Sequence, residues 1–318
     1  MSTPFPWQEP PADCELPIWR YTRNPIINRN PFPGVAKIYN SAVTPFDGAY
    51  AGVFRAEYRT GMSHLHVGRS ADGIHWDFAP APIPVTAGAD EPAFDYGYDP
   101  RLCRVGEEYF ITWCNGYHGP TIGLASTRDF KNFTQLENAF LPCNRNGVLF
   151  PRKINGHYAI LSRPSDQGHT PFGDIFYSVS PDLTHWGQHR FVMGAGPEWW
   201  QAKKIGAGPN PIETPAGWLL IYHGVCGTCN GFIYSAGLAL LDLERPWHVI
   251  KRCPGYIMAP EEPYEVTGSV PNVAFPSSAL VDAATGRVAF YYGAADTVTG
   301  LAFSTVDRLL DYVNTHGK

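Results

Sequence analysis

A degenerate repeat is the feature that most constrains the fold of this 318-residue chain. The segments LHVGRSADGIHW, IGLASTRDFKNF and IFYSVSPDLTHW each combine an apolar strand pattern, a Ser, and an Asp four residues before an aromatic residue. The repeated pairs are Asp72/Trp76, Asp129/Phe133 and Asp182/Trp186, with weaker copies at Asp242/Trp247 and Asp307/Tyr312. Five spaced copies predict an all-β, five-bladed β-propeller, with a two-layer sandwich as the less fitting alternative. We expect the Asp to close a turn and the aromatic residue to pack between blades.

The remaining sequence also favours an all-β protein. Short β-rich runs broken by Gly, Pro, Asn and Asp dominate, and only TVDRLLDYVNTHG near the C-terminus has a helical pattern. The 32 Gly and 30 Pro are spread along the chain, as expected for turn residues. We predict an N-terminal arm over residues 1–33 and a single five-bladed β-propeller domain over residues 34–318.

Charge and cysteine content exclude several classes of function. The net charge is −5 and no Lys/Arg run occurs, so we expect no nucleic-acid partner and no membrane-surface role. No apolar stretch is long enough to span a bilayer, and the N-terminus lacks a signal-peptide pattern. Seven Cys without framework spacing favour a cytoplasmic protein. The proline-rich arm could pack on a neighbouring subunit, so we also consider a homo-oligomer.

A predicted hairpin precedes each copy of the repeat, over residues 40–59, 98–116, 149–165, 208–225 and 271–296. The start of the first strand and the end of the second lie at one edge of such a hairpin. That edge carries the polar residues Asn40, Asp99, Arg101, Arg152, Asn210, Asn272, Arg55, Glu57, Asn115, Arg163, His223 and Asp296. Because the innermost strands of a propeller ring one axis, we predict that these residues converge on a central-axis active site.

Basic residues outnumber acids at this edge. The bases are Arg55, Arg101, Arg145, Arg152, Arg163, Lys204 and His223, against Asp99, Asp296 and Glu57. Such an excess in an acidic protein indicates a bound anion, and bidentate Arg suits phosphate or carboxylate. The alternative is that these arginines form structural ion pairs between blades.

Other chemical motifs are weak. His64 and His66 share one face of a strand, but no third ligand is evident, so we predict no metal site. Cys226 and Cys229 have redox spacing without a βαβ context. There is no phosphate-binding loop, dinucleotide fingerprint or nucleophile elbow, so we predict no cofactor.

Six motifs, in this order, resemble glycoside hydrolase family 130, the inverting β-mannoside phosphorylases. They are YDPR, GVLFPRKINGHYAILSRPS, KKIGAGPNPIET, YHGV with CNGFIYSAGLALLDLERP, VPNVAFP and YYGAAD, and they extend over nearly the whole chain. The resemblance implies a five-bladed propeller that cleaves a β-mannoside oligosaccharide reversibly, with inorganic phosphate as co-substrate. The products would be α-D-mannose 1-phosphate and a shortened acceptor.

The same resemblance implies roles for individual residues. Asp99 would be the catalytic acid, acting through the mannose 3-hydroxyl. The phosphate-binding residues would be Arg145, Arg163, Lys204, His223 and Tyr234. The substrate-binding residues would be Asn40, Ser41, Arg55, Tyr98 and Asp296. A phosphate nucleophile is already charged, so no second carboxylate is needed to activate water.

Two other functions remain open on the same fold. An inverting β-mannosidase would need an acid such as Glu57 to activate water. A non-catalytic sugar-binding propeller would use Trp113, Trp199 or Trp200 as stacking platforms. The linkage (β-1,4 or β-1,2) and the acceptor sugar, including glucose and N-acetylglucosamine, are also open. We expect the Trp199-Trp200 loop and the loop over residues 166–174 to decide them.

The tetrapeptide Tyr98-Asp99-Pro100-Arg101 has a local prediction of its own. A proline biases the preceding residue toward extended backbone, which would aim the Asp99 side chain at the axis. By strand alternation, Arg101 would share a face with Asp99 and either orient the acid or meet the substrate.

Overall fold

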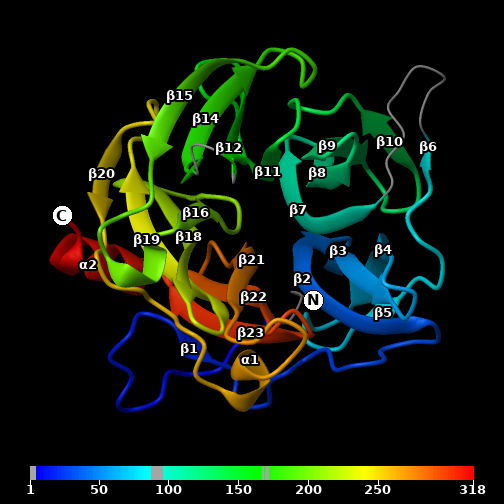
Figure 1. Cartoon of the computed structure of the whole chain (residues 1–318), viewed down its shortest axis with the longest axis horizontal. Helices are drawn as coiled ribbons and strands as arrows, with labels where there is room; N and C mark the ends of the chain where they lie inside the picture. Colours follow the sequence, from blue (N-terminus) through cyan, green and yellow to red (C-terminus); the bar gives the residue numbers. More distant parts are fainter. Residues whose placement is uncertain (1–4, 87–95, 167, 169–171) are drawn as a thin grey trace.

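The computed structural model describes residues 5–86, 96–166, 168 and 172–318. The chain forms five sheets arranged in a ring around a central axis (Figure 1). The predicted five-bladed β-propeller is therefore confirmed. Each predicted hairpin supplies strands nearest the axis, because short apolar runs with tight polar turns pair locally before the chain moves to the next blade.

The first three blades contain strands β2 to β15. Blade 1 contains β2 (Val35–Phe46), β3 (Ala49–Tyr58), β4 (Ser63–Ser70) and β5 (Asp77–Phe78). Blade 2 contains β7 (Gly97–Val105), β8 (Glu108–Gly116), β9 (Pro120–Thr127), β10 (Phe133–Leu136) and β6 (Val85–Thr86). Blade 3 contains β11 (Asn144–Leu149), β12 (Tyr158–Asp166), β13 (Phe172–Gly173), β14 (Ile175–Ser180) and β15 (Gly187–Met193).

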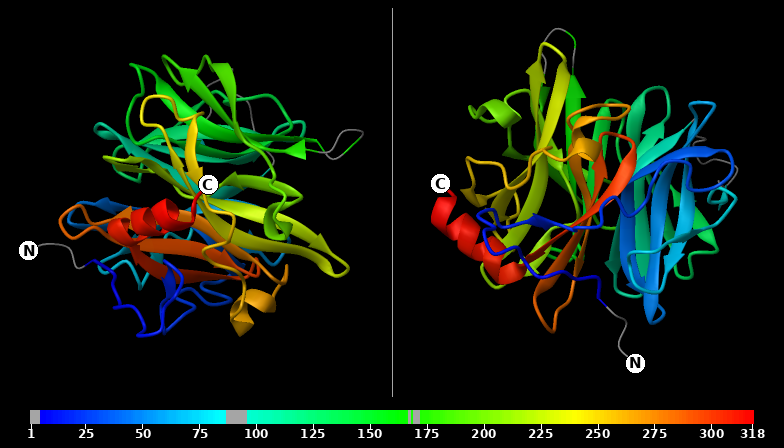
Figure 2. Two further views of the ribbon diagram at one scale, coloured as in Figure 1. Left: turned by 90° about the vertical axis from the view of Figure 1, so that its left-hand side faces the viewer. Right: turned by 90° about the horizontal axis from the view of Figure 1, so that it is seen from below.

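The last two blades are built from the C-terminal part of the chain and strand β1 (Trp19–Arg20), and the helices accompany them. Blade 4 contains β16 (Lys204–Ala207), β17 (Ile212–Thr214), β18 (Gly217–Thr228), β19 (Gly231–Leu241) and β20 (Val249–Arg252). Blade 5 contains β21 (Ala274–Val281), β22 (Arg287–Ala294), β23 (Val298–Thr305) and β1 (Trp19–Arg20). The helices are η1 (Trp199–Gln201), α1 (Pro263–Val266) and α2 (Val306–His316). Figure 2 shows α2 lying along the outside of the ring. Among the described residues, no helix is long and apolar enough to cross a bilayer.

The N-terminal segment packs on the chain's own fifth blade. Strand β1 pairs antiparallel with β23, so it is the outermost strand of a sheet otherwise built from the C-terminal part of the chain. Arg20 donates from Nε to Glu265 at 2.7 Å and from one terminal nitrogen to the same carboxylate at 2.9 Å. Glu265 is fully buried. These contacts close the ring by joining its two ends, while the domain boundary at residue 34 stays a prediction.

The repeated turn behaves as predicted in four copies. Asp72 Oδ1 accepts hydrogen bonds from two backbone N–H groups at 2.8 Å, and Asp129, Asp182 and Asp242 do the same in their own turns. The aromatic residues of the first three copies pack in hydrophobic clusters. The fifth copy is wrong, because Asp307 lies in the first turn of α2, whose N-cap is Thr305.

Candidate active site

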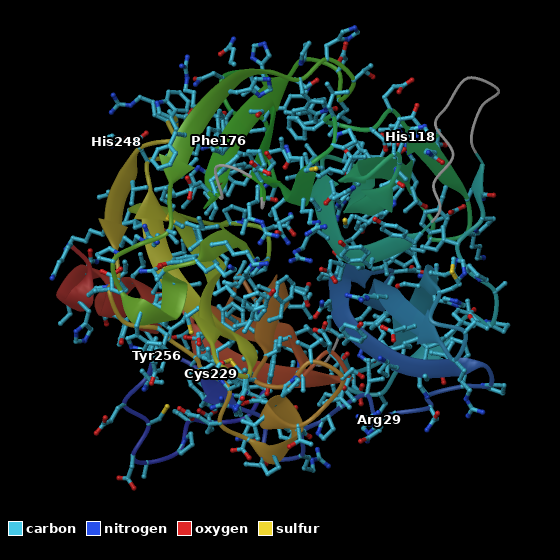
Figure 3. The ribbon with its side chains drawn as sticks, viewed as in Figure 1. Arg29, His118, Phe176, Cys229, His248 and Tyr256 are labelled. Carbon is cyan, nitrogen blue, oxygen red and sulfur yellow. The ribbon has the colours of Figure 1, made fainter. Side chains whose placement is uncertain are left out.

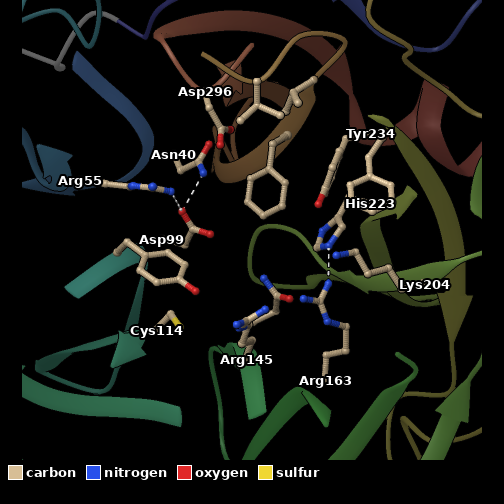
Figure 4. A pocket seen from close by; sticks show the side chains of 16 residues that line it. Asn40, Arg55, Asp99, Cys114, Arg145, Arg163, Lys204, His223, Tyr234 and Asp296 are labelled. Atoms are coloured by element: carbon tan, nitrogen blue, oxygen red, sulfur yellow. Dashed lines mark hydrogen bonds and ion pairs between the residues drawn. The ribbon is translucent and has the colours of Figure 1, made fainter. Parts of the chain in front are cut away.

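A pocket opens at the ends of the inner strands, as the sequence predicted. Its cavity volume is about 390 Å³. Figure 4 shows the side chains that converge on it from all five blades. The lining residues are Asn40, Arg55, Tyr98, Asp99, Cys114, Arg145, Asn146, Arg163, Lys204, His223, Phe232, Tyr234, Val270, Val273, Phe275 and Asp296.

The first strands of blades 1, 2 and 3 reach the pocket through the same irregularity. Each contains a β-bulge in which two residues face one on the neighbouring strand. The first bulge residue is Asn40, Asp99 or Asn146, with φ of 53°, 52° and 52°. Asn and Asp tolerate this left-handed region better than other side chains, and a bulge re-aims the side chain it carries. The three residues are therefore equivalent positions, and Asp99 is the one acid among them.

Asp99 does not have the extended backbone that the following proline favours, so that prediction was wrong. The bulge places φ in the left-handed region instead. Arg55 donates to Asp99 Oδ1 at 2.8 Å and Asn40 Nδ2 donates to the same oxygen at 2.7 Å. Among the described residues, no hydrogen bond reaches Oδ2, which faces the pocket in Figure 4. One oxygen is thus held while the other faces the cavity.

Arg55 packs against two aromatic rings. Its guanidinium carbon lies 4.2 Å from the ring centre of Tyr39 and 4.8 Å from that of Tyr98. These contacts and the ion pair with Asp99 fix the guanidinium in one place despite its burial. Because Arg55 is fixed, it holds the Asp99 carboxylate in one orientation.

Asp296 is a second carboxyl group in the pocket. Burial raises its pKa to about 6. The negative charges of Asp99 and Glu57 also raise this pKa, while the positive charges of Arg55 and Lys37 lower it. Figure 4 places it beside Asn40, whose buried Oδ1 makes no hydrogen bond to any described residue. Asp296 is therefore protonated more readily than an ordinary aspartate.

The opposite wall of the pocket is cationic. Arg163 is 5% exposed, and its terminal nitrogen lies 3.1 Å from His223 Nε2. Burial lowers the pKa of His223 well below its usual value, and the charges of Arg163, Arg101 and Lys204 lower it further. The imidazole is therefore neutral, accepts from Arg163 at Nε2 and carries its hydrogen on Nδ1. Burial, together with Arg163, Arg145 and Lys203, lowers the pKa of Lys204 to about 8.

Unsatisfied polar atoms gather on this wall. On this wall, four buried atoms make no hydrogen bond to any described residue: Arg145 Nε, Asn146 Oδ1, Arg163 Nε and His223 Nδ1. Buried polar groups of this kind require a polar ligand or water. Four cations line the pocket against two carboxyl groups, so the ligand chemistry that this wall fits is that of an anion.

Tyr98 and Arg145 meet at Cys114, at the edge between the two walls. Both side chains interact with the Cys114 thiol, and all three residues line the pocket. Burial raises the pKa of Cys114 to about 11, so the thiol stays protonated. It acts here as a small packing group with a weak donor.

Ten of the eleven predicted site residues line the pocket; the exception is Ser41. Ser41 is fully buried, and its hydroxyl lies 3.3 Å from that of Thr299. Sequence reasoning missed Cys114, Asn146, Phe232, Val270, Val273 and Phe275. Asn146 could have been found by aligning the first strands of blades 1 to 3. The apolar residues carry no such signal.

Two basic residues do not reach the pocket lining, and the predictions for them were wrong. Arg152 lies in the turn after β11, where it pairs with Glu213 at 2.7 Å and Glu244 at 2.9 Å. Arg101 is 2% exposed and donates to backbone carbonyls. The bulge breaks the alternation that would have placed Arg101 on the same face as Asp99.

The other sequence motifs have structural roles. His66 is fully buried, with Tyr58 and the Ala79 carbonyl as partners of its two ring nitrogens. Across the described residues, no group of three or more His, Cys, Asp or Glu is placed to hold a metal ion. Cys226 is buried and Cys229 is exposed, on the β18–β19 hairpin (Figure 3).

The chain is similar to known proteins along nearly its whole length. A family model described as beta-1,4-mannooligosaccharide phosphorylase, of glycoside hydrolase family 130, matches residues 4–315. A beta-1,4-mannooligosaccharide phosphorylase of Ruminococcus albus is 55% identical over 98% of this chain and 95% of its own length. A 4-O-beta-D-mannosyl-D-glucose phosphorylase of Bacteroides fragilis is 31% identical over 93% of this chain and 80% of its own. The solved beta-1,2-mannobiose phosphorylase of Listeria innocua has a TM-score of 0.83 and 26% identity, covering 94% of this chain and 99% of its own.

Proposed function

The chain belongs to glycoside hydrolase family 130, and we propose that it phosphorolyses β-1,4-linked manno-oligosaccharides, with Asp99 as the acid and the cationic wall as the phosphate site. Phosphorolysis of β-mannosides follows from the named relatives. The observation that carries the residue assignment is the division of one pocket into an oriented acid and an anion-binding wall. Inorganic phosphate is the co-substrate.

The reaction needs few protein groups. Phosphate, held by Arg145, Arg163, Lys204, His223 and Tyr234, attacks the anomeric carbon. The bond from that carbon to the glycosidic oxygen breaks, and the Asp99 proton reaches that oxygen through the mannose 3-hydroxyl. The bound anion supplies the nucleophile, so positioning and charge compensation replace a second carboxylate. The anomeric carbon inverts, giving α-D-mannose 1-phosphate and the shortened acceptor.

The two alternative functions have less support. Glu57 lies outside the pocket lining, accepts from Tyr39 at 2.6 Å and pairs with Lys37. Although burial opposes it, hydrogen bonds from Lys37 and Tyr39 lower the pKa of Glu57, which makes it a poor base for water. Trp113 and Trp200 are buried, which leaves Trp199 as the one exposed platform of the three. The other loop expected to decide the acceptor, over residues 166–174, lies partly outside the described residues.

The linkage can be tested directly. We expect the highest kcat/KM with β-1,4-mannobiose and longer β-1,4-manno-oligosaccharides in the presence of phosphate. β-1,2-Mannobiose and 4-O-β-mannosyl-glucose serve as comparison substrates, with α-mannose 1-phosphate followed by NMR. Preference for either comparison substrate would reject the β-1,4 assignment.

The lowered pKa of Lys204 predicts a pH dependence of phosphate binding. Below pH 8 the free enzyme presents a charged ammonium, and above it the ammonium loses its proton, so phosphate affinity should fall as pH rises through about 8. Isothermal titration of phosphate between pH 6.5 and 9.5 measures this. Lys204→Arg, which stays charged throughout, should remove the loss of affinity. An identical loss in wild type and Lys204→Arg would exclude Lys204 as its source.

A further inference from the structure

Arg101 is a fully buried arginine. It is 2% exposed, and it forms no ion pair with any described carboxylate. Burial lowers its pKa to about 10, which the Asp99 charge partly offsets. Leaving an arginine in such a place is costly unless its donors are used. Its hydrogen bonds therefore indicate what it does.

Within the described residues, its hydrogen bonds all go to backbone carbonyls, and its second terminal nitrogen is buried and makes none. Nε donates to the Gly208 carbonyl at 2.6 Å. One terminal nitrogen donates to the carbonyls of Asp99 at 3.2 Å and Pro100 at 3.1 Å. The guanidinium carbon also lies 5.3 Å from the ring centre of Phe275, a pocket residue. Arg101 thus binds the two bulge residues on one side and blade 4 on the other.

The partner of Arg101 in blade 4 is Gly208, which lies so close to its neighbours that a side chain would not fit. A Cβ atom at Gly208 would lie 2.9 Å from the Ile221 carbonyl and 3.1 Å from the Pro276 carbonyl. The glycine backbone can therefore sit among three neighbouring strands, where its carbonyl meets Arg101. Gly208 also donates its N–H to Ile221 at 3.0 Å, which fixes this peptide.

We propose that Arg101 is a positioning residue that holds the left-handed bulge at Asp99 and so aims the Asp99 carboxyl group into the pocket. The inference rests on the proposed role of Asp99 as the acid. A left-handed backbone at a non-glycine residue persists only where its surroundings fix it. The guanidinium fixes this backbone because it binds the carbonyls of both bulge residues. It leaves the carboxylate oxygens of Asp99 free to interact with Arg55, Asn40 and the substrate. A direct ion pair with the Asp99 side chain would instead occupy the acid.

The test compares Arg101→Met and Arg101→Lys with Arg252→Met. Arg252 is a matched control because it donates to the Gly194 carbonyl, Tyr222 and Gln201, away from the pocket lining. We expect Arg101→Met to lower kcat for β-1,4-mannobiose by about 100-fold, since a misplacement of about 1 Å can cost that much. Its phosphate KM should stay within about threefold of wild type, because the hydrogen bonds of Arg101 within the described residues go to backbone carbonyls and not to the proposed phosphate ligands. Arg101→Lys should recover about tenfold of the loss, because it keeps the charge but cannot bridge three carbonyls.

A kcat of Arg101→Met within about threefold of wild type would overturn the proposal, as would an equal loss of kcat in Arg252→Met at the same decrease in Tm. If Arg101→Met does not fold, Arg101→Lys decides, and wild-type kcat in that variant overturns the proposal. Asp99→Asn is measured in parallel. If Asp99→Asn retains turnover, the proposed acid fails and this inference fails with it. If Asp99→Asn is inactive while Arg101→Met is active, only this inference fails.

Discussion

Asp99→Asn should lower the kcat of phosphorolysis by about 10²- to 10⁴-fold, the usual contribution of a general acid. The amide cannot give the proton that the departing glycosidic oxygen needs. The fold should survive, because Asn tolerates the left-handed backbone at this bulge and its carbonyl can still accept from Arg55 and Asn40. Steady-state kinetics with β-1,4-mannobiose and phosphate give kcat, and the Tm reports the fold.

The control is Asp182→Asn. Asp182 lies in an outer turn, where Oδ1 accepts from the backbone N–H groups of Thr184 and His185. This variant makes the same chemical change outside the pocket, so its kcat should match wild type. Wild-type turnover in Asp99→Asn would remove Asp99 from the role of acid.

Arg163→Ala should raise the phosphate KM by about 10- to 100-fold, because hydrogen bonds to a charged group contribute about 1.5–3 kcal/mol. Arg163 is buried on the cationic wall, beside the neutral His223 and near Lys204. Removing it deletes a fixed charge from the anion site while leaving Asp99 and its partners in place. The KM for the oligosaccharide at saturating phosphate should therefore change by no more than about twofold.

Arg152→Ala is the matched control for this experiment. Arg152 pairs with Glu213 and Glu244 outside the pocket, so its removal should leave the phosphate KM unchanged. If Arg163→Ala also left the phosphate KM unchanged, Arg163 would not belong to the phosphate site.

The architecture was predictable because it rests on local signals. Each Asp-turn motif binds its own backbone, and each hairpin pairs with its sequence neighbour, so strand pattern and turn residues suffice. The copy at Asp307 failed because Thr305 caps a helix at that place. The pairing of β1 with β23 joins opposite ends of the chain and has no local signal.

The sequence was sufficient to predict which edge of the strands forms the pocket. It was not sufficient to predict the backbone geometry at the bulges. Alternation predicted that Arg101 and Asp99 share a face, but one additional residue in β7 reverses the alternation. The left-handed backbone at Asp99 contradicts the preference that Pro100 imposes, because strand pairing on both sides of the bulge overrides a local bias. Asn40, Asp99 and Asn146 show that blade equivalence is the signal that locates such positions.

The most direct test of the account is the phosphate dependence of cleavage. The enzyme is incubated with a β-1,4-manno-oligosaccharide, with and without inorganic phosphate, and the products are followed by NMR. The account predicts α-D-mannose 1-phosphate and a shortened acceptor with phosphate, and no cleavage without it. Release of free mannose at the same rate under both conditions would contradict it.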